Sequence, residues 1–210
     1  MEEAAARNWL ERAFNVPRET MARLEDFASL LRLENERQNL VSKASLGQLW
    51  LRHIADSAQL LRFAPSGSSW VDLGTGAGFP GLVVAMLHNG PVTLVEERRL
   101  RVDFLRRAAV TLRIDVEIVQ ARAERLPPRP FDVISARAFA PLARLLELGT
   151  GLSTTKSVWL LPKGRNAETE LAALDSSWQG SFRLEPSVTD PEAAIIVAEG
   201  VHRKAERKRG

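Results

Sequence analysis

Apolar residues recur at helical spacing in the first third of the chain. After Pro17 they follow one helix face at Met21, Leu24, Phe27, Leu30, Leu31 and Leu33. A second helix is expected over residues 46–63, with its buried side formed by Leu49, Trp50, Ile54, Leu60 and Leu61. The turn-rich segment 65–69 then breaks the helical pattern. The sequence therefore predicts an N-terminal helical extension over residues 1–64.

Strand and helix patterns alternate after this break. Five apolar runs predict strands at residues 70–73, 92–95, 116–119, 131–135 and 157–161. Helical stretches follow most of them, ending at residue 87, covering 98–112, starting near 141 and covering 167–174. Two further runs, 182–185 and 194–197, lie too close for a crossover helix and are expected to pair antiparallel. Residues 65–201 are therefore predicted to form an α/β domain with a doubly wound, Rossmann-like, seven-stranded, mostly parallel sheet.

A glycine-rich segment joins the first predicted strand to its helix, with glycines at Gly74, Gly76, Gly78 and Gly81. Glycine permits a tight turn and lets a ligand approach the backbone closely. Glu96 ends the next strand, 22 residues beyond Gly74, where a carboxylate can accept both ribose hydroxyls of a nucleoside. A plain glycine turn is the alternative, but the strand, the helix and the acid together predict a nucleoside cofactor.

The glycine pattern alone leaves the cofactor open. Residues 76–81 satisfy G-x-G-x-x-G, which is typical of dinucleotide sites, so a nicotinamide-dependent oxidoreductase is one hypothesis. ATP is disfavoured because Leu82 and Val83 stand where a phosphate loop requires Lys and Ser or Thr. Asp72, two residues before the first glycine, completes a segment that resembles motif I of class I S-adenosylmethionine-dependent methyltransferases. Their sheet also has seven strands and a terminal antiparallel hairpin, so this interpretation is favoured.

Several motifs recur together in one family. They occupy residues 39–42, 52–57, 72–81, 104–105, 121–124, 131–138 and 163–164. In this order they resemble the bacterial small-subunit ribosomal RNA methyltransferase G family, also called GidB, from about residue 20 to residue 175. The resemblance implies methyl transfer from S-adenosylmethionine to N7 of one guanine in 16S ribosomal RNA. Leu100 departs from the family, whose members commonly carry a basic residue there.

The resemblance also implies roles for the cofactor residues. Gly74 and Phe79 would contact the methyl donor, and Gly76 and Gly78 would give access to the backbone. Glu96 would take the ribose hydroxyls, and the pair Ala123 and Glu124 would flank the adenine.

Two cations follow the fourth and fifth predicted strands, at the sheet edge where such folds bind ligands. Arg137 is assigned to the cofactor site, because a guanidinium can hold a carboxylate bidentately, although a substrate phosphate or a surface position is an alternative. The segment 135–138 lacks the Asn/Asp-Pro-Pro-aromatic sequence typical of enzymes that methylate exocyclic amines. Lys163 is predicted to contact RNA phosphate, with a solvated loop position as the alternative.

Arg52 and His53 are the other predicted RNA-binding residues, with a buried structural network including Asp56 as the alternative. No Gly-x-Ser-x-Gly elbow accompanies His53, which argues against a hydrolase triad. Arg122 is expected to anchor to Glu96 or to RNA.

Two aromatic residues, Phe79 and Phe139, are candidate surfaces for stacking of the target base. A position in the core is the usual alternative for such residues.

The implied reaction needs little acid–base help. Guanine N7 already presents a lone pair and can attack in line without losing a proton, so no catalytic residue is assigned. Positioning and desolvation would supply the catalysis. Because N7 lies in the deep major groove of an RNA helix, the target should be a loop or a splayed base.

The amino-acid composition excludes several classes of protein. The chain has no cysteine, which excludes disulfides and thiolate metal sites, and no stretch reaches the roughly 18 apolar residues of a membrane span. The net charge is +3, of which residues 202–210 carry five cations and one anion, or +4, so the remainder is 3 − 4 = −1. The 24 arginines against 5 lysines suit phosphate contacts but also fit a GC-rich genome.

We therefore expect a cytoplasmic, monomeric enzyme without metal or membrane, whose partner is 16S rRNA or the small ribosomal subunit. The basic tail, residues 202–210, is expected to be either a phosphate-tracking segment or a solvated end. A noncatalytic RNA-binding protein with the same fold is a further hypothesis.

Overall fold

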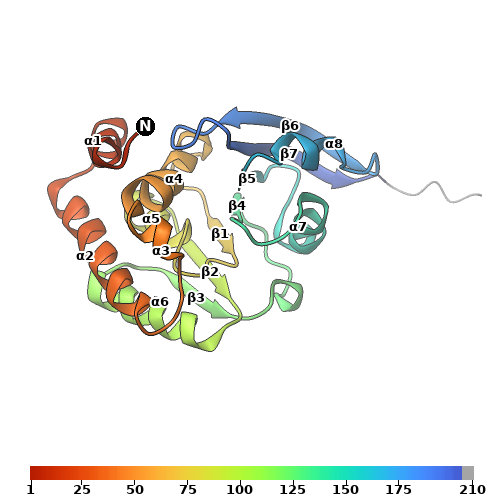
Figure 1. Cartoon of the computed structure of the whole chain (residues 1–210). Coiled ribbons are helices and arrows are strands. Elements are labelled where there is room, and N and C mark those ends of the chain that lie inside the picture. Colours follow the sequence, from red (N-terminus) through yellow and green to blue (C-terminus); the bar gives the residue numbers. More distant parts are fainter. Residues whose placement is uncertain (205–210) are drawn as a thin grey trace, which may run out of the picture.

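A seven-stranded sheet with helices on both faces forms the centre of the protein (Figure 1). The computed structural model describes residues 1–204, so residues 205–210 of the predicted basic tail lie outside it. The strands are β1 (Trp70–Leu73), β2 (Val92–Glu96), β3 (Glu117–Gln120), β4 (Val133–Ser135), β5 (Val158–Lys163), β6 (Trp178–Pro186) and β7 (Ala194–Arg203). Their order is β3-β2-β1-β4-β5-β7-β6, and β7 runs antiparallel to both neighbours. The predicted fold class is confirmed.

The two faces of the sheet are covered by different helices. Along β2, Leu94 packs on one face and Val95 on the other, the alternation expected of a strand buried on both sides. Figure 1 shows α2 and α6 side by side beyond one face, with α7 and α8 on the other side of the molecule. The helices around the sheet are α5 (Gly81–Leu87), α6 (Arg99–Leu112), α7 (Leu142–Gly149) and α8 (Ala167–Ala172).

The N-terminal helices dock directly on this body. They are α1 (Glu3–Phe14), α2 (Arg18–Asn35) and α3 (Lys43–Leu46). Leu24 and Phe27 of α2 belong to the same buried cluster as Leu82 of α5 and Leu105 of α6. The predicted stripe is wrong at Leu33, which is 63% exposed because it points away from the face that α2 buries. The division of the chain at residue 64 stays a prediction.

The second predicted helix is a run whose pitch changes along its length. A π-helical segment (Trp50–Ala55) leads into α4 (Asp56–Ala58) and a 3-10 segment (Gln59–Phe63). Two further 3-10 turns are Ala123–Arg125 and Thr150–Leu152. Periodicity predicted the helical run but not its pitch, which depends on partners distant in sequence.

The last two strands are longer than predicted. Gly180 lies at a bulge in β6, and most side chains of this edge strand are exposed or half-buried, so its apolar signal is weak. β7 continues through His202 and Arg203, the first two residues of the predicted tail. Within residues 1–204 no helix combines the length and apolar character needed to cross a membrane.

Candidate active site

Three adjoining cavities open along the carboxyl ends of the central strands. The first, the β1–β2 cavity, is about 440 Å³ and is lined by Gly74, Glu96, Ala123, Glu124 and Phe139 among others. The glycine-loop cavity is about 390 Å³, and its lining includes His53, Gly74, Gly76, Phe79 and Arg137. The β4–β5 cavity is about 470 Å³, and its lining includes Arg52, Arg137, Phe139, Lys163 and Asp190. Because all three share Ala138, they meet around one loop after β4.

The glycine loop is held against the acid that ends β2. Gly74, Gly76 and Gly78 have φ angles of 68°, 58° and 97°, where a side chain would be strained. The N–H of Gly76 donates to one carboxylate oxygen of Glu96 at 3.0 Å, and the N–H of Arg98 donates to the other at 2.9 Å. Each oxygen therefore keeps a lone pair free. The predicted juxtaposition of loop and carboxylate is present.

The residues of the β1–β2 cavity fit a nucleoside. A Cβ at Gly74 would overlap the Phe139 ring, so the glycine lets this ring pack directly on the backbone at the strand end and form a wall of the cavity. The carboxylate of Glu124 is paired with Arg144 at 3.1 Å, so Ala123 and the backbone beside it would flank a base better than this acid. Arg122 pairs with Glu97 at 3.0 Å and not with Glu96, so of its two expected partners only RNA stays a prediction. Arg101 instead lies 3.7 Å from Glu96.

Asp72 fixes the end of the glycine loop where α5 begins. Its buried carboxylate accepts hydrogen bonds from the Gly81 N–H at 2.9 Å and from the Ser135 hydroxyl at 2.8 Å. The Trp70 indole in turn donates to the Ser135 oxygen at 2.8 Å. Burial raises the pKa of Asp72 to about 6, against the effect of these hydrogen bonds. The acid thus ties β1, β4 and the start of α5 together, a role that the motif alone did not reveal.

Arg137 lies at the centre of an internal network. Its guanidinium donates to His53 Nδ1 at 2.9 Å, to an Asp56 carboxylate oxygen at 3.1 Å and to the Arg52 carbonyl at 3.0 Å. Two of its five N–H groups therefore remain available to a ligand. This placement excludes the alternative of a surface arginine at a helix start.

His53 is neutral in this network. Burial, followed by the charges of Arg137 and Arg52, lowers its pKa to about 3. Since Nδ1 accepts from Arg137, the proton belongs to Nε2, which is buried without a hydrogen-bond partner in residues 1–204. The ring also stacks on Phe79 at 4.8 Å between centroids.

The two aromatic candidates for base stacking, Phe79 and Phe139, have different environments in the structure. Phe79 is buried and also packs on Phe27 at 5.2 Å, so the core interpretation applies to it, although it lines the glycine-loop cavity. Phe139 is 38% exposed and lines both the β1–β2 and the β4–β5 cavities. Phe139 is therefore the stronger candidate for stacking.

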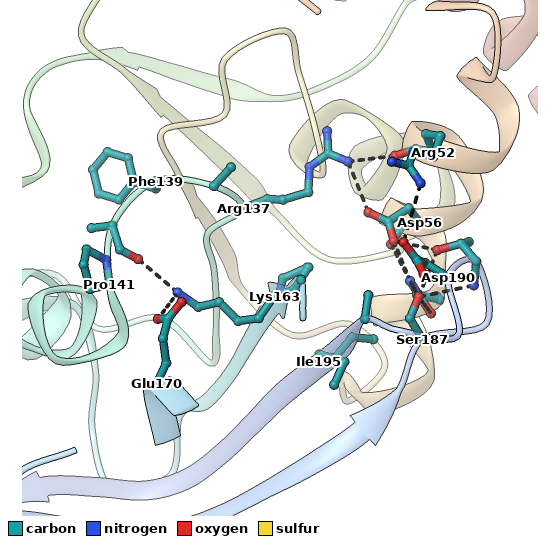
Figure 2. A pocket seen from close by; sticks show the side chains of 18 residues that line it. Arg52, Asp56, Arg137, Phe139, Pro141, Lys163, Glu170, Ser187, Asp190 and Ile195 are labelled. Atoms are coloured by element: carbon teal, nitrogen blue, oxygen red, sulfur yellow. Dashed lines mark hydrogen bonds and ion pairs between the residues drawn. The ribbon is translucent and has the colours of Figure 1, made fainter. Parts of the chain in front are cut away.

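Charged side chains line the β4–β5 cavity on two sides (Figure 2). On one side, Arg52 is half-exposed and lies 3.5 Å from Asp190, beside Asp56. On the other side, Figure 2 shows Lys163 turned toward Glu170.

Lys163 is occupied by internal partners. Its side chain is only 10% exposed and donates to the Ala140 carbonyl at 3.0 Å and to Glu170 at 2.8 Å. The same Glu170 oxygen accepts from the Leu142 N–H at 2.9 Å, at the start of α7. This geometry favours positioning of the loop after β4 over the predicted phosphate contact.

Comparison with known proteins identifies the family. The model of the GidB family, described as rRNA small subunit methyltransferase G, matches residues 20–192. A protein named ribosomal RNA small subunit methyltransferase G from Zymomonas mobilis subsp. mobilis is 47% identical over 95% of this chain and 94% of its own length. A protein of the same name from Rhizorhabdus wittichii is 51% identical over 100% of this chain and 98% of its own length.

Solved structures agree on the fold. A SAM-dependent methyltransferase from Aquifex aeolicus has a TM-score of 0.55 and 16% identity, covering 68% of this chain and 88% of its own. MtNAS in complex with S-adenosylmethionine has a TM-score of 0.57 and 16% identity, covering 94% of this chain and 87% of its own. The sequence match assigns rRNA as the substrate and S-adenosylmethionine as the methyl donor. This chain belongs to the rRNA small subunit methyltransferase G family and is an S-adenosylmethionine-dependent rRNA methyltransferase.

Proposed function

We propose that this enzyme methylates N7 of a specific guanine in the 16S rRNA of the small ribosomal subunit, and that it uses no general base. Family membership assigns rRNA methylation and removes the oxidoreductase and noncatalytic hypotheses. The guanine and its N7 atom follow from the motif resemblance. S-adenosylmethionine supplies an electrophilic methyl group on a sulfonium. The N7–carbon bond forms as the sulfur–carbon bond breaks, with the electron pair left on sulfur and the positive charge moved to the purine.

The observation that supports a reaction without a base is that the nearby titratable groups are engaged. His53 directs Nδ1 at Arg137, and its lowered pKa of about 3 makes it a poor proton acceptor. The oxygens of Asp56 accept from Gln59, Thr189 and Arg137. A purine N7 has no proton to lose, so such a site needs only to orient the base and exclude water.

The donor would occupy the β1–β2 and glycine-loop cavities. Its binding residues would be Gly74, Gly76, Gly78, Phe79, Glu96, Ala123, Glu124 and Arg137. Among them, Glu96 would accept the ribose hydroxyls with its free lone pairs, and Arg137 would direct its two free N–H groups at the donor carboxylate.

The target guanine would enter the β4–β5 cavity, which shares the wall formed by Phe139 with the β1–β2 cavity. An extruded base fits this arrangement, with the exposed face of Phe139 as a stacking platform. Arg52, with His53 behind it, would contact RNA from the π-helical segment. We further propose that one copy of the chain forms the whole site, so the enzyme acts as a monomer.

The position of the methyl group tests this function. Purified enzyme and labelled S-adenosylmethionine are incubated with 16S rRNA, or with small subunits, from cells that lack the enzyme. Digestion and mass spectrometry should find the label in 7-methylguanosine. The turnover rate should stay flat between about pH 7.5 and about pH 9, because neither N7 nor His53 titrates there and Asp72, whose pKa burial raises to about 6, is already ionised. Label on an exocyclic amine or a ribose, or a rate that rises with one ionisation within that range, would contradict the proposal.

Replacing Lys163 by methionine distinguishes loop positioning from phosphate contact. We expect kcat to fall about 10-fold, because the loop after β4 loses its tie to Ala140 and Glu170. The slope of log affinity for rRNA against log salt should not change. A lysine that binds phosphate would instead lower that slope by about 0.7 when it is removed. The exposed Lys156→Met is the matched control and should leave kcat unchanged.

A further inference from the structure

The N-terminal helix α1 makes a specific contact with the segment that carries Arg52. The two carboxylate oxygens of Glu3 accept hydrogen bonds from the backbone N–H groups of Trp50 at 3.0 Å and Leu51 at 2.8 Å. Glu3 lies outside the family match, which begins at residue 20. We propose that Glu3 is a positioning residue for RNA binding, because it fixes the π-helical segment that directs Arg52 at the β4–β5 cavity. This inference rests on the proposed contact of Arg52 with RNA.

The contact with Glu3 provides acceptors for backbone N–H groups at the start of the helical run. The first N–H groups of a helix lack partners within the helix, and here those of Trp50 and Leu51 are among them. A carboxylate at this end satisfies both donors with charge-assisted hydrogen bonds and interacts favourably with the helix dipole. Arg52 is the next residue, and its own N–H bonds to the Gln48 carbonyl at 2.8 Å. Glu3 therefore acts one residue before the side chain proposed to contact RNA.

Packing holds α1 in place for this contact. Ala6 of α1 forms a small buried cluster with Leu51 and Ala55 of the π-helical segment. Trp9 and Trp50 lie at the edge of that cluster. Because the small alanine side chains let the two backbones approach closely, the carboxylate of Glu3 reaches the helix end without a mediating group.

The π-helical segment is held from two sides. Glu3 takes N–H groups at its start, and Arg137 donates to the Arg52 carbonyl at 3.0 Å. π-helical turns are rare and are frequently found at functional sites. If the turn relaxed by one residue toward α-helical pitch, Arg52 would rotate by about 100° around the axis and leave the cavity wall. Loss of Glu3 removes the restraint on the backbone N–H groups at the start of the segment.

Removal of Glu3 should change the affinity for rRNA in the opposite direction from the one that net charge alone predicts. Removing a carboxylate makes the protein more positive, which by itself would tighten binding to a polyanion. Positioning of Arg52 predicts weaker binding instead. We expect Glu3→Ala to weaken binding of 16S rRNA about 5- to 10-fold and to lower the salt slope by about 0.7, the contribution of one lost phosphate contact. Glu3→Gln keeps one acceptor oxygen and should fall between Glu3→Ala and the wild type.

The experiment measures rRNA affinity at several salt concentrations, and affinity for S-adenosylhomocysteine, in six proteins. They are the wild type, Glu3→Ala, Glu3→Gln, Arg52→Ala, the double variant of Glu3→Ala with Arg52→Ala, and Glu2→Ala as a control with the same charge change at an exposed neighbour. We expect the double variant to bind rRNA no more weakly than Arg52→Ala alone. Glu2→Ala should bind rRNA as tightly as the wild type, and the affinity for S-adenosylhomocysteine should stay within about twofold in all six proteins.

The outcomes separate this inference from the proposed function. The positioning role is overturned if Glu3→Ala binds rRNA as tightly as the wild type or more tightly. It is also overturned if the losses of rRNA affinity in Glu3→Ala and Arg52→Ala add up in the double variant. Equal loss of rRNA and S-adenosylhomocysteine binding also overturns it, because that pattern indicates general unfolding. If Arg52→Ala itself binds rRNA normally, the proposed contact of Arg52 fails and the inference fails with it, while formation of 7-methylguanosine by the wild type still stands.

Discussion

Replacing Glu96 by alanine is expected to weaken binding of S-adenosylhomocysteine at least about 100-fold. Hydrogen bonds to a charged group contribute about 1.5–3 kcal/mol each, and this carboxylate would lose two with the ribose. The substitution also frees the N–H groups of Gly76 and Arg98, which Glu96 holds at 3.0 and 2.9 Å. The loop that forms the donor cavity would therefore lose both a ligand contact and a restraint.

Titration calorimetry with S-adenosylhomocysteine, and separately with NAD, measures this effect. Glu96→Gln keeps the shape and one acceptor oxygen but not the charge, so it should lose about 10-fold. Glu36→Ala is the matched control, because it makes the same charge change at an exposed acid that lines none of the three cavities. Undiminished binding by Glu96→Ala would contradict the ribose contact.

Replacing Gly81 by alanine is expected to destabilise the fold by about 3 kcal/mol. A Cβ there would overlap the Leu94 side chain and come within 2.8 Å of an Asp72 carboxylate oxygen. Both neighbours are fully buried in strands, so α5 would have to move away from the sheet. That movement would also break the bond between the Gly81 N–H and Asp72 and leave a buried carboxylate poorly satisfied.

Thermal unfolding provides the measurement. For a chain of this size, the expected loss corresponds to a fall in Tm of roughly 10 °C. Gly47→Ala is the matched control, since a Cβ there meets only the Ala44 carbonyl at an ordinary 3.7 Å and the backbone is already in the right-handed helical region. We expect this control to be neutral, or to stabilise by about 0.5 kcal/mol through a less flexible unfolded chain. Equal Tm values for the two variants would refute the close-packing argument.

The strands at the centre of the sheet could be predicted because both of their faces are buried. Such strands have nearly continuous apolar runs, as in residues 158–161, and β5 forms over Val158–Lys163. The predicted strand over residues 182–185 is shorter than the edge strand β6. An edge strand needs few apolar residues, and the bulge at Gly180 interrupts the apolar pattern that it has. Leu33 was misplaced because a stripe of leucines does not say which of them faces a neighbour.

Part of the candidate site could likewise be predicted from the sequence, and part could not. Spacing alone brought Glu96 to the glycine loop, since parallel strands end at one edge of the sheet and the loop follows the neighbouring strand. No spacing rule could assign Lys163 to Ala140 and Glu170, because a lysine after a strand can turn inward or outward with equal ease. Its direction depends on which acceptors the surrounding helices leave unpaired.

The order of strands and helices, the glycine loop with its acid, and the family could all be predicted from the amino-acid sequence. These are local or periodic features, and backbone sterics and burial act on them over a few residues. The partners of Arg137, the neutral state of His53 and the π-helical pitch beside Glu3 became visible in the folded structure alone. Those depend on pairing between groups up to 85 positions apart, which the chain brings together only when the sheet and its helices have formed.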